Sequence, residues 1–347
     1  MNKTDEQIYP FVSVILPVYN EGNFILRSLG ALLVQSYPHE RMEIILSDGM
    51  STDNTRDLIE QLTGQSSVEI KIINNVKKIA PSGLNRALEV AKGEVIVRVD
   101  GHTIVESDYV GECVAALSRS GAANAGGRMH AVSEGSVGQA IAIATSSRFG
   151  IGNARFHYSE KEEYVDTVYL GAWPKRIFER YGLFNEELVR NQDDEFNYRL
   201  RANGERILLS PRIRSTYYNR SSFKKLWRQY FQYGYWKVRV LQMHPQQMSV
   251  RQFVPFVFVT SLILTAILSL FTQIGLWAFA GMVVSYLLAN FSAAAMTSKA
   301  KIALMPMISL SFAILHLSYG FGFLLGIFSF LGHWFRPKTA DVLPVDQ

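Results

Sequence analysis

The stretch VIVRVDGHT, residues 95–103, joins an apolar run to an abrupt polar ending. Four of its first five residues are β-branched, which predicts a buried strand. The run ends in Asp100 and His102 with Gly101 between them, and a spacing of two puts both side chains on the same side of an extended chain. Both can ligate a divalent metal, and Gly101 leaves room for a bulky group to approach. The alternative is an ordinary turn, because Asp-Gly is a common turn dipeptide.

Strand and helix candidates alternate upstream of this stretch. Apolar runs predict strands over 11–18, 43–46, 70–73 and 95–99, and helical spacing predicts helices over 24–34, 55–62 and 84–91, the last ended by Gly93. This alternation predicts an α/β fold with a parallel sheet and crossover helices. Ligands of such sheets bind at the carboxyl ends of the strands. Because Asp48, Asp100 and the loop 17–21 all follow strand candidates, one ligand could meet all three.

Charge is distributed unevenly along the 347 residues, which carry a net charge of +5. Residues 252–335 contain no Asp or Glu, and their only Lys or Arg residues are Lys299 and Lys301. We therefore expect a soluble domain followed by a membrane part. The N-terminus has no basic segment followed by a long apolar core, so it does not resemble a signal peptide. A single cysteine, Cys113, excludes an intrachain disulfide, and we expect the soluble part in the cytoplasm.

Residues 223–241 predict an amphipathic helix. Their apolar and aromatic residues follow i, i+3, i+4, i+7 spacing, and the remaining positions include Lys224, Lys225, Arg228, Lys237 and Arg239. A basic amphipathic helix rich in aromatic residues suits a membrane interface, especially before an apolar segment. The alternative is an ordinary surface helix packed on the core.

Three apolar stretches follow. Residues 253–271 and 274–296 are each long enough to cross a bilayer at about 20 residues, and they form a hairpin around Thr272-Gln273. Lys299 and Lys301 then favour the cytoplasmic side. The third stretch, 302–331, is longer than one crossing needs and too short for two. A single crossing would put the following Arg336 and Lys338 outside, so either the charge rule is broken or part of the stretch is re-entrant.

Four strings carry a family resemblance: VILPVYNE, DGMSTDNT, GLNRALEVAKGEVIVRVDGHT and NQDDEFNYRL. In this order they resemble glycosyltransferase family 2 over roughly residues 12–237. They are most similar to bacterial exopolysaccharide glycosyltransferases of the succinoglycan type, which have Asp-x-His in place of Asp-x-Asp and a C-terminal membrane segment. The resemblance implies the GT-A fold, a Rossmann-like nucleotide-sugar domain, and a nucleotide-diphosphate sugar as donor.

The resemblance assigns the loop with Pro17, Tyr19 and Glu21 to the nucleoside. Tyr19 can offer a ring face, and Glu21 can accept hydrogen bonds from ribose hydroxyls. A capped helix start with Asn20 as the cap is compatible with this assignment.

In the family, a carboxylate at the end of the second strand binds the imide N–H of uracil, and Asp48 matches it. The family often has two acidic residues there, and Ser47 takes the first place here. Asp53, further along, is instead expected to be a helix cap, with Thr52 as the other candidate for that cap.

Asp100 and His102 match the family's Asp-x-Asp pair, which holds Mg²⁺ or Mn²⁺ against the diphosphate of the donor. The resemblance thus implies a divalent metal that acts as a Lewis acid on the leaving nucleotide. Because His102 replaces the second carboxylate and imidazole suits transition metals better than Mg²⁺, Mn²⁺ is the expected ion.

The family's base is the Asp of a Glu-Asp motif at a helix start, and NQDDEFNYRL matches with Asp193. Gln192 replaces the Glu, and Phe196 and Arg199 take the places of Leu and Arg. Mutual repulsion within the consecutive carboxylates 193–195 is expected to raise some of their pKa values, which suits a general base. The alternative is that acidic residues simply favour a helix N-terminus.

QYGYW, residues 232–236, is similar to the Gln-x-x-Arg-Trp motif of processive synthases, with Tyr235 in the place of Arg. Those enzymes have more membrane helices, so we expect this chain to add one sugar. Trp236 is a candidate for stacking on a sugar, with an interfacial aromatic as the alternative. The candidates for donor or acceptor contacts are therefore Asn85, Arg199, Gln232 and Trp236.

We expect four segments: a catalytic domain over 1–222, an interface helix over 223–250, a transmembrane domain over 251–335 and a tail over 336–347. The expected activity is inverting transfer of one sugar, glucose from UDP-glucose, to a polyprenyl-diphosphate-linked saccharide in exopolysaccharide biosynthesis. The alternatives are sugar transfer to polyprenyl phosphate, as in dolichol-phosphate mannose synthase, and a non-catalytic membrane scaffold. The expected place is the bacterial cytoplasmic membrane, with the catalytic domain in the cytoplasm and no nucleic-acid partner.

Overall fold

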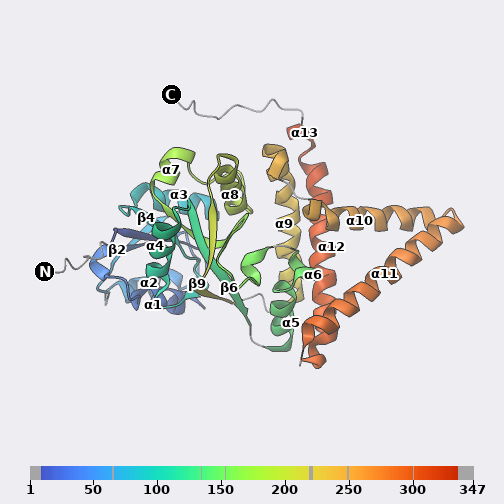
Figure 1. The fold of residues 1–347 in the computed structure, drawn as a ribbon, viewed down its shortest axis with the longest axis horizontal. Coiled ribbons are helices and arrows are strands. Elements are labelled where there is room, and N and C mark those ends of the chain that lie inside the picture. Colours follow the sequence, from blue (N-terminus) through green and yellow to red (C-terminus); the bar gives the residue numbers. More distant parts are fainter. Residues whose placement is uncertain are drawn as a thin grey trace. The chain divides into compact units, whose positions relative to one another are not determined.

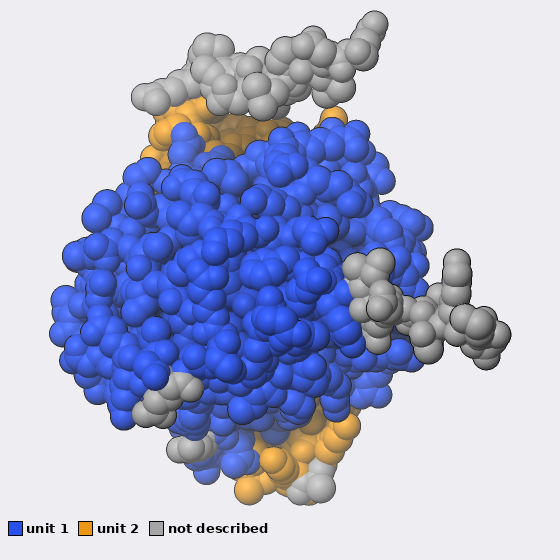
Figure 2. Space-filling model, turned by 90° about the vertical axis from the view of Figure 1, so that its left-hand side faces the viewer, with its two compact units in different colours: residues 1–221 blue, residues 222–347 orange. Residues whose placement is uncertain are grey.

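The computed structural model describes residues 9–64, 66–133, 135–152, 154–218, 222–247, 250–299 and 301–334. The chain divides into two compact units, residues 1–221 and 222–347, which Figure 2 shows in different colours. The predicted tail 336–347, with Arg336 and Lys338, lies outside the described residues.

The first half of unit 1 is the predicted parallel sheet (Figure 1). Its strands are β1 (Val12–Val18), β2 (Met42–Asp48), β3 (Glu69–Asn74) and β4 (Val95–Arg98), in the order β3-β2-β1-β4 with parallel pairing throughout. The helices between them are α1 (Ile25–Leu33), α2 (Thr55–Thr63) and α3 (Ala80–Val90). The alternation predicted from the sequence is confirmed, and the carboxyl ends of these four strands meet at one edge of the sheet.

The bounds of α3 differ from the prediction at both ends. The helix begins at Ala80 with Pro81 in its first turn, where proline costs no hydrogen bond, so it is longer than the predicted 84–91. Its C-cap is Ala91, and the expectation that Gly93 ends the helix is wrong. Gly93 instead lets the chain approach β1, because a Cβ there would lie 2.3 Å from the backbone nitrogen of Ser13.

In the second half of the sheet most neighbouring strands pair antiparallel, and the exception is the parallel pair of β6 and β9. Its strands are β5 (Thr103–Val105), β6 (Asn124–Val132), β7 (Glu163–Tyr164), β8 (Tyr169–Pro174) and β9 (Ile207–Tyr218). They continue the order as β4-β8-β6-β9-β5, with β7 on β9. The helices of this half are α4 (Tyr109–Ser120), α5 (Gly135–Thr145), α6 (Arg148–Ile151), α7 (Arg176–Tyr181) and α8 (Gln192–Ala202). The pairing of β4 with β8 joins the two halves into one sheet.

Both faces of the parallel half are covered by helices. Alternate residues of β1 enter different clusters, with Val14 and Leu16 beside Leu29 of α1, and Ile15 beside Leu84 of α3. Burial on both faces explains why these strands are continuous apolar runs. It also leaves the ends of the strands, rather than their faces, as the place where polar side chains gather.

Unit 2 is helical within its described residues: α9 (Phe223–Met243), α10 (Val250–Ser269), α11 (Gln273–Ser298), α12 (Met305–Ser329) and α13 (Leu331–Trp334). Three segments are long and apolar enough to cross a membrane, Val250–Ser269, Gln273–Ser298 and Ile302–Ser329. The predicted hairpin is confirmed, and Thr272 caps α11 by accepting a hydrogen bond from the Gly275 amide at 2.9 Å. The third stretch forms one continuous helix after a short 3₁₀ turn at Ile302–Leu304.

Candidate functional site

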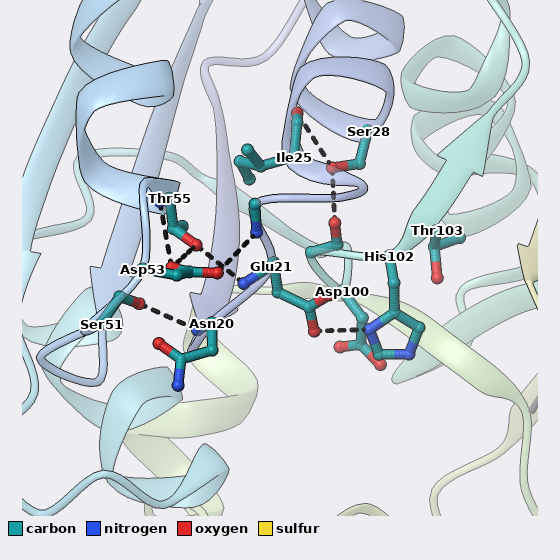
Figure 3. A network of polar contacts seen from close by, with 12 residues as sticks. Asn20, Glu21, Ile25, Ser28, Ser51, Asp53, Thr55, Asp100, His102 and Thr103 are labelled. Carbon is teal, nitrogen blue, oxygen red and sulfur yellow. Dashed lines mark hydrogen bonds and ion pairs between the residues drawn. The ribbon is translucent and has the colours of Figure 1, made fainter.

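The loop after β1 is locked to the loop after β2 (Figure 3). Asn20 has a left-handed backbone (φ 53°), its side-chain oxygen accepts from the Thr52 amide at 2.8 Å, and its own amide donates to Ser51 Oγ at 3.0 Å. The expectation that Asn20 caps the first helix is wrong. The helix α1 begins at Ile25, and Asn20 is used to hold two loops together.

Asp53 completes this lock. One carboxylate oxygen accepts from the Gly22 amide at 3.1 Å, and the other accepts from the amide and the hydroxyl of Thr55. The hydroxyl of Thr55 in turn accepts from the Glu21 amide at 2.8 Å. The side-chain hydrogen bond from Thr55 contributes most to lowering the pKa of Asp53. The N-cap position belongs to Asn54, so Asp53 is not the cap residue, although its carboxylate does bind an amide of the first turn.

Asp48, Tyr19 and Pro17 lie around these loops. Asp48 is the last residue of β2, is buried, and accepts from the amide and hydroxyl of Ser51 at 3.0 and 2.7 Å. The exposed ring of Tyr19 packs over Gly49, where a Cβ would lie 3.1 Å from the ring. Pro17 pairs with Ser47 across β1 and β2. The residues predicted to bind the nucleoside therefore share the carboxyl ends of two adjacent strands.

Asp100 and His102 lie in a turn. The Asp100 carbonyl accepts from the Thr103 amide at 2.9 Å, so the turn alternative is confirmed and the extended geometry is wrong. The turn directs His102 toward the first loop, where its Nδ1 lies 2.9 Å from Glu21 Oε1 (Figure 3). Gly101 is needed for this contact, because a Cβ there would lie 3.0 Å from Glu21 Cγ.

These residues fit a divalent cation as a partial ligand set. If Nδ1–H of His102 donates to Glu21, the lone pair of Nε2 is left for a ligand, and a carboxylate of this kind orients many metal-binding histidines. Within the described part of the chain, no group of three or more His, Cys, Asp or Glu side chains is arranged to hold a metal. Asp100 and His102 would thus supply two ligands, and the donor's own oxygens would have to supply the rest.

Arg98 lies between the carboxylates of Asp100 and Asp193, and the sequence prediction did not include it. Its side chain is 7% exposed, its Nε donates to Asp100 Oδ1 at 2.9 Å, and its Nη2 donates to Oδ2 at 3.3 Å. Its Nη1 lies 3.8 Å from Asp193 Oδ2. Burial would lower the pKa of this guanidinium, but Asp100 and Asp193 together hold it above its ordinary value. The sequence did contain a signal for this role, because Arg98 is the only charged residue in an apolar strand. A buried charge requires a partner of opposite charge, so an acidic residue was to be expected nearby.

Asp193 is the second residue of α8, and its carboxylate is 38% exposed. One oxygen accepts from the Asp194 amide at 2.9 Å, and the other faces Arg98. Glu195 differs, because it is buried and both its oxygens accept from Arg199. The structure therefore brings Asp193 to the end of β4, beside Asp100.

Asn85 and Arg199 shape the segment before α8. The amide group of Asn85 is buried, donates to Phe184 O and Glu186 Oε1, and accepts from the Phe184 amide. The guanidinium of Arg199 donates to the carbonyls of Tyr181 and Leu183 as well as to Glu195. Both were predicted to contact the donor or the acceptor. Their polar atoms instead hold the chain that leads into α8.

The other two candidates, Gln232 and Trp236, lie on α9 in unit 2. The ring of Trp236 packs against Phe330, with centroids 5.7 Å apart.

An aromatic cluster that was also missed borders His102. The ring of Tyr217 lies 5.3 Å from the imidazole, and the ring of Tyr169 lies 5.9 Å from Tyr217. The Tyr169 hydroxyl bonds to Thr103 Oγ1 at 2.6 Å, and burial, followed by the charge of Asp100, raises its pKa so that it stays a neutral phenol. The cluster continues through Phe156 to His157, whose pKa is lowered to about 3 by burial.

Comparison with known proteins supports the family. The model of glycosyl transferase family 2 matches residues 13–182. A dolichyl N-acetyl-α-D-glucosaminyl phosphate 3-β-D-2,3-diacetamido-2,3-dideoxy-β-D-glucuronosyltransferase of Methanococcus voltae is 32% identical over 231 residues, 65% of this chain and 72% of that protein. A succinoglycan biosynthesis protein of Rhizobium meliloti is 26% identical over 244 residues, 70% of this chain and 73% of that protein.

Solved structures identify the fold. The mannosyltransferase PcManGT of Pyrobaculum calidifontis, in complex with GDP-mannose and Mn²⁺, is similar with a TM-score of 0.60 at 17% identity, over 93% of this chain and 88% of that chain. A fragment of Staphylococcus aureus TarS has a TM-score of 0.51 at 16% identity, over 94% and 93% of the two chains. Unit 1 has the GT-A-like α/β fold, and the chain belongs to glycosyltransferase family 2, with relatives in exopolysaccharide biosynthesis.

Proposed function

We propose that this enzyme is a membrane-bound inverting glycosyltransferase. It transfers a single sugar, glucose from UDP-glucose, to a polyprenyl-diphosphate-linked saccharide in exopolysaccharide biosynthesis. Two relatives support this choice: one is named for transfer to a dolichyl-phosphate-linked sugar and the other for succinoglycan biosynthesis. The observation that carries the proposal is the approach of Asp193, from α8, to the Arg98–Asp100 pair at the end of β4. This approach supports Asp193 as the base beside the proposed donor site.

In this proposal Asp48, Tyr19 and Pro17 hold the nucleoside, and Asp193 receives the proton of the acceptor hydroxyl. The hydroxyl oxygen attacks the anomeric carbon as the bond to the nucleotide diphosphate breaks, and this single displacement inverts the anomeric centre. Removal of the proton by a positioned carboxylate typically contributes about 10²–10⁴-fold in rate. The half-exposed position of Asp193 leaves its carboxylate open to an acceptor.

A divalent cation, Mn²⁺ rather than Mg²⁺, belongs to the proposal, with Asp100 and His102 as its protein ligands. When bound, it would neutralise charge on the departing diphosphate as a Lewis acid. Glu21 then supports His102 by accepting from its Nδ1, in addition to its predicted contact with the ribose. The solved relative that holds Mn²⁺ supports this assignment at the level of the fold.

The test is a transfer assay with the detergent-solubilised chain. UDP-glucose is offered together with a synthetic polyprenyl-diphosphate sugar or with polyprenyl phosphate, and GDP-mannose and UDP-GlcNAc are offered as competing donors. Transfer to the diphosphate-linked sugar alone supports the proposal. Transfer only to polyprenyl phosphate would support the alternative that resembles dolichol-phosphate mannose synthase. Donor binding without transfer to either acceptor would support the non-catalytic scaffold.

We further propose that the enzyme resides in the bacterial cytoplasmic membrane with its catalytic domain, residues 1–222, in the cytoplasm. The interface helix 223–250 and the transmembrane domain 251–335 would hold it there. Lys299 and Lys301 after α11 support this orientation by the positive-inside rule. A reporter in the turn at Thr272-Gln273 is expected outside and one near Lys299 inside. The reverse result would contradict the orientation.

A further inference from the structure

In unit 2, α9 and α12 run side by side in the same direction (Figure 1). The contacts occur in the same order along both helices, and the backbones approach closely at glycines. A Cβ on Gly234 would lie 2.1 Å from the Tyr319 carbonyl oxygen, and one on Gly326 would lie 2.7 Å from the Tyr235 carbonyl oxygen. Further along, Gln242 donates to the Phe330 carbonyl at 2.9 Å. Residues 319–330 of α12 therefore follow α9 closely.

The basic residues of α9 set the depth of this pair in a membrane. Lys224, Lys225, Arg228, Lys237 and Arg239 are spread over most of the helix, and lysine or arginine at the centre of a bilayer is strongly disfavoured. We therefore place α9 outside the hydrocarbon core. Since α12 contacts α9 through residues 319–330, that half of α12 must lie at the same level.

The other half of α12 is too short to cross alone. Residues 305–318 extend for about 21 Å at about 1.5 Å per residue, whereas the hydrocarbon core is about 30 Å thick. Burial also separates the three apolar segments. In an 18-residue apolar window of each segment, 50% of the α12 segment is buried in the structure, against 6% for α10 and 11% for α11. The α12 helix is therefore packed against protein to a much larger extent than either helix of the hairpin.

We propose that α9 and α12 form a two-helix platform on the cytoplasmic surface of the bilayer and that only the α10–α11 hairpin crosses it. This rests on the proposed membrane-bound function. The apolar side of the platform would lie among the acyl chains of the lipids, and the exposed Lys224, Lys225 and Arg228 of α9 would contact anionic headgroups. A groove of about 500 Å³ marks that apolar side, lined by Trp227, Phe231, Phe321, Leu324, Leu325 and Phe328.

The proposal removes the charge conflict found in the sequence. If α12 does not cross, Arg336 and Lys338 stay on the same side as Lys299 and Lys301, as the positive-inside rule favours. The described residues of unit 2 then cross the membrane twice.

Fusions of GFP and of alkaline phosphatase to the C-terminus of the full chain test the platform, with fusions in the Thr272-Gln273 turn as the control. We expect a fluorescent GFP fusion at the C-terminus and an active phosphatase fusion in the turn. An active phosphatase at the C-terminus of a membrane-integrated chain would show that α12 crosses and would overturn the platform alone. Release of the chain from membranes by alkaline carbonate would instead contradict membrane integration, and with it the proposed function.

The position of Arg98 in unit 1 carries a second inference, which comes from different observations and rests on the proposed function of Asp193 and of the cation at Asp100. Its fork binds both oxygens of Asp100, so a cation at Asp100 would have to share that carboxylate with a buried guanidinium. Its remaining nitrogen, Nη1, is buried, has no hydrogen-bond partner among the described residues, and faces Asp193 Oδ2 at 3.8 Å. The geometry points to Arg98 as a positioning residue, which fixes Asp193 beside the donor site and competes with the divalent cation for Asp100.

Two substitutions separate these effects. Arg98→Met removes the charge and keeps most of the stem, whereas Arg98→Lys keeps the charge without the fork. We expect Arg98→Met to tighten Mn²⁺ binding in the presence of UDP by about tenfold, because a repelling charge is removed and Asp100 is released. The same variant should lower kcat by about 10²-fold, because Asp193 loses its cationic neighbour. Arg98→Lys should recover part of both changes.

Electron paramagnetic resonance of Mn²⁺ measures the affinity without any need for turnover. The matched control is Arg119→Met, which removes an exposed arginine paired with Glu162 on the surface, and neither value should change there. Circular dichroism confirms that each variant is folded, and Arg98→Lys is the readout if Arg98→Met does not fold. Weaker or unchanged Mn²⁺ binding in the folded variant would overturn the competition.

A double substitution tests whether Arg98 acts through Asp193. If it does, adding Arg98→Met to Asp193→Asn should lower kcat by much less than the product of the separate losses. Losses that multiply in full would show that Arg98 acts elsewhere.

Discussion

The donor side and the acceptor side of the candidate site are built in different ways. On the donor side, the loops after β1 and β2 and the turn at Asp100 are tied together by short hydrogen bonds from Asn20, Asp53 and Glu21. On the acceptor side, Asp193 faces its nearest cation at 3.8 Å and keeps an exposed carboxylate. Under the proposed function, this difference means that the fold prepares the donor side in advance, whereas Asp193, the proposed base, stays accessible to the acceptor.

The largest expected effect comes from removing the metal. EDTA should abolish transfer and Mn²⁺ should restore it, because the proposed cation neutralises the charge that builds on the departing diphosphate, which the carboxylate of Asp100 cannot do. His102→Asp should keep activity and shift the preference toward Mg²⁺, since carboxylates suit that ion better. Metal titrations of the transfer rate provide the measurement. Full activity in EDTA would contradict the assignment of Asp100 and His102 as ligands of a required cation.

The next effect concerns the base. Asp193→Asn should lower kcat by about 10²–10⁴-fold, because the amide keeps the size of the side chain but cannot take a proton. The dissociation constant for UDP should stay nearly unchanged, since Asp48, Asp100 and His102 are intact.

Asp194→Asn is the matched control for the base. It makes the same charge change one residue along α8, where the side chain points about 100° away. Rates and UDP titrations on both variants decide the assignment. If Asp194→Asn loses activity while Asp193→Asn keeps it, the base is Asp194 and the assignment of Asp193 is wrong.

A smaller effect is expected in the lock between the donor loops. Asp53→Ala removes the acceptor of the Gly22 and Thr55 amides and should weaken UDP binding by about fivefold, the equivalent of about 1 kcal/mol. The rate at saturating donor should change little, because Asp193 is untouched. Asp57→Ala, which removes an exposed carboxylate in the first turn of the following helix α2, is the control. Equal UDP affinity in the native chain, Asp53→Ala and Asp57→Ala would show that the hydrogen bonds between the two loops do not prepare the donor site.

The smallest effect on activity at neutral pH is expected from His157, which instead makes the stability of the fold depend on pH. Burial lowers the pKa of His157 to about 3, whereas an unfolded histidine titrates near 6.5. Below about pH 6.5 the unfolded chain binds a proton that the folded chain does not, so stability falls as the pH drops toward 3, by up to about 1.4 kcal/mol per unit. His157→Gln should flatten this part of the profile, measured by thermal unfolding in detergent at several pH values. Identical profiles would show that His157 is already charged in the folded chain.

The parallel half of the fold could be predicted because each strand is a short apolar run that ends at a polar loop. The second half, in which β6 and β9 form a parallel pair among antiparallel ones, could not be predicted in this way. β6 contains Gly126 and Gly127, where its register with β9 shifts, and the close approach of Ile213 O to Gly127 is a tertiary contact. Its pairing with distant strands leaves no simple alternation in the sequence.

The candidate site shows the same limit. The motifs located Asp48, Asp100 and Asp193, because their residue types and order are characteristic of the family. They could not show the direction of Arg98, which depends on which strand and helix lie beside β4. They also could not separate Asn85, whose amide holds a neighbouring loop, from a residue that contacts a ligand. A motif reports a residue type, whereas its role depends on what surrounds it.

The burial of Cys113 has a practical consequence for measuring motion in this enzyme. It is the only cysteine of the chain, it is fully buried in the core, and burial raises the pKa of its thiol far above neutrality. A cysteine introduced at an exposed position such as Tyr19 would therefore be the only thiol that reacts quickly in the native protein. Spin or fluorescent labels can thus be attached at single sites to follow loop movements during a catalytic cycle, without first constructing a cysteine-free variant.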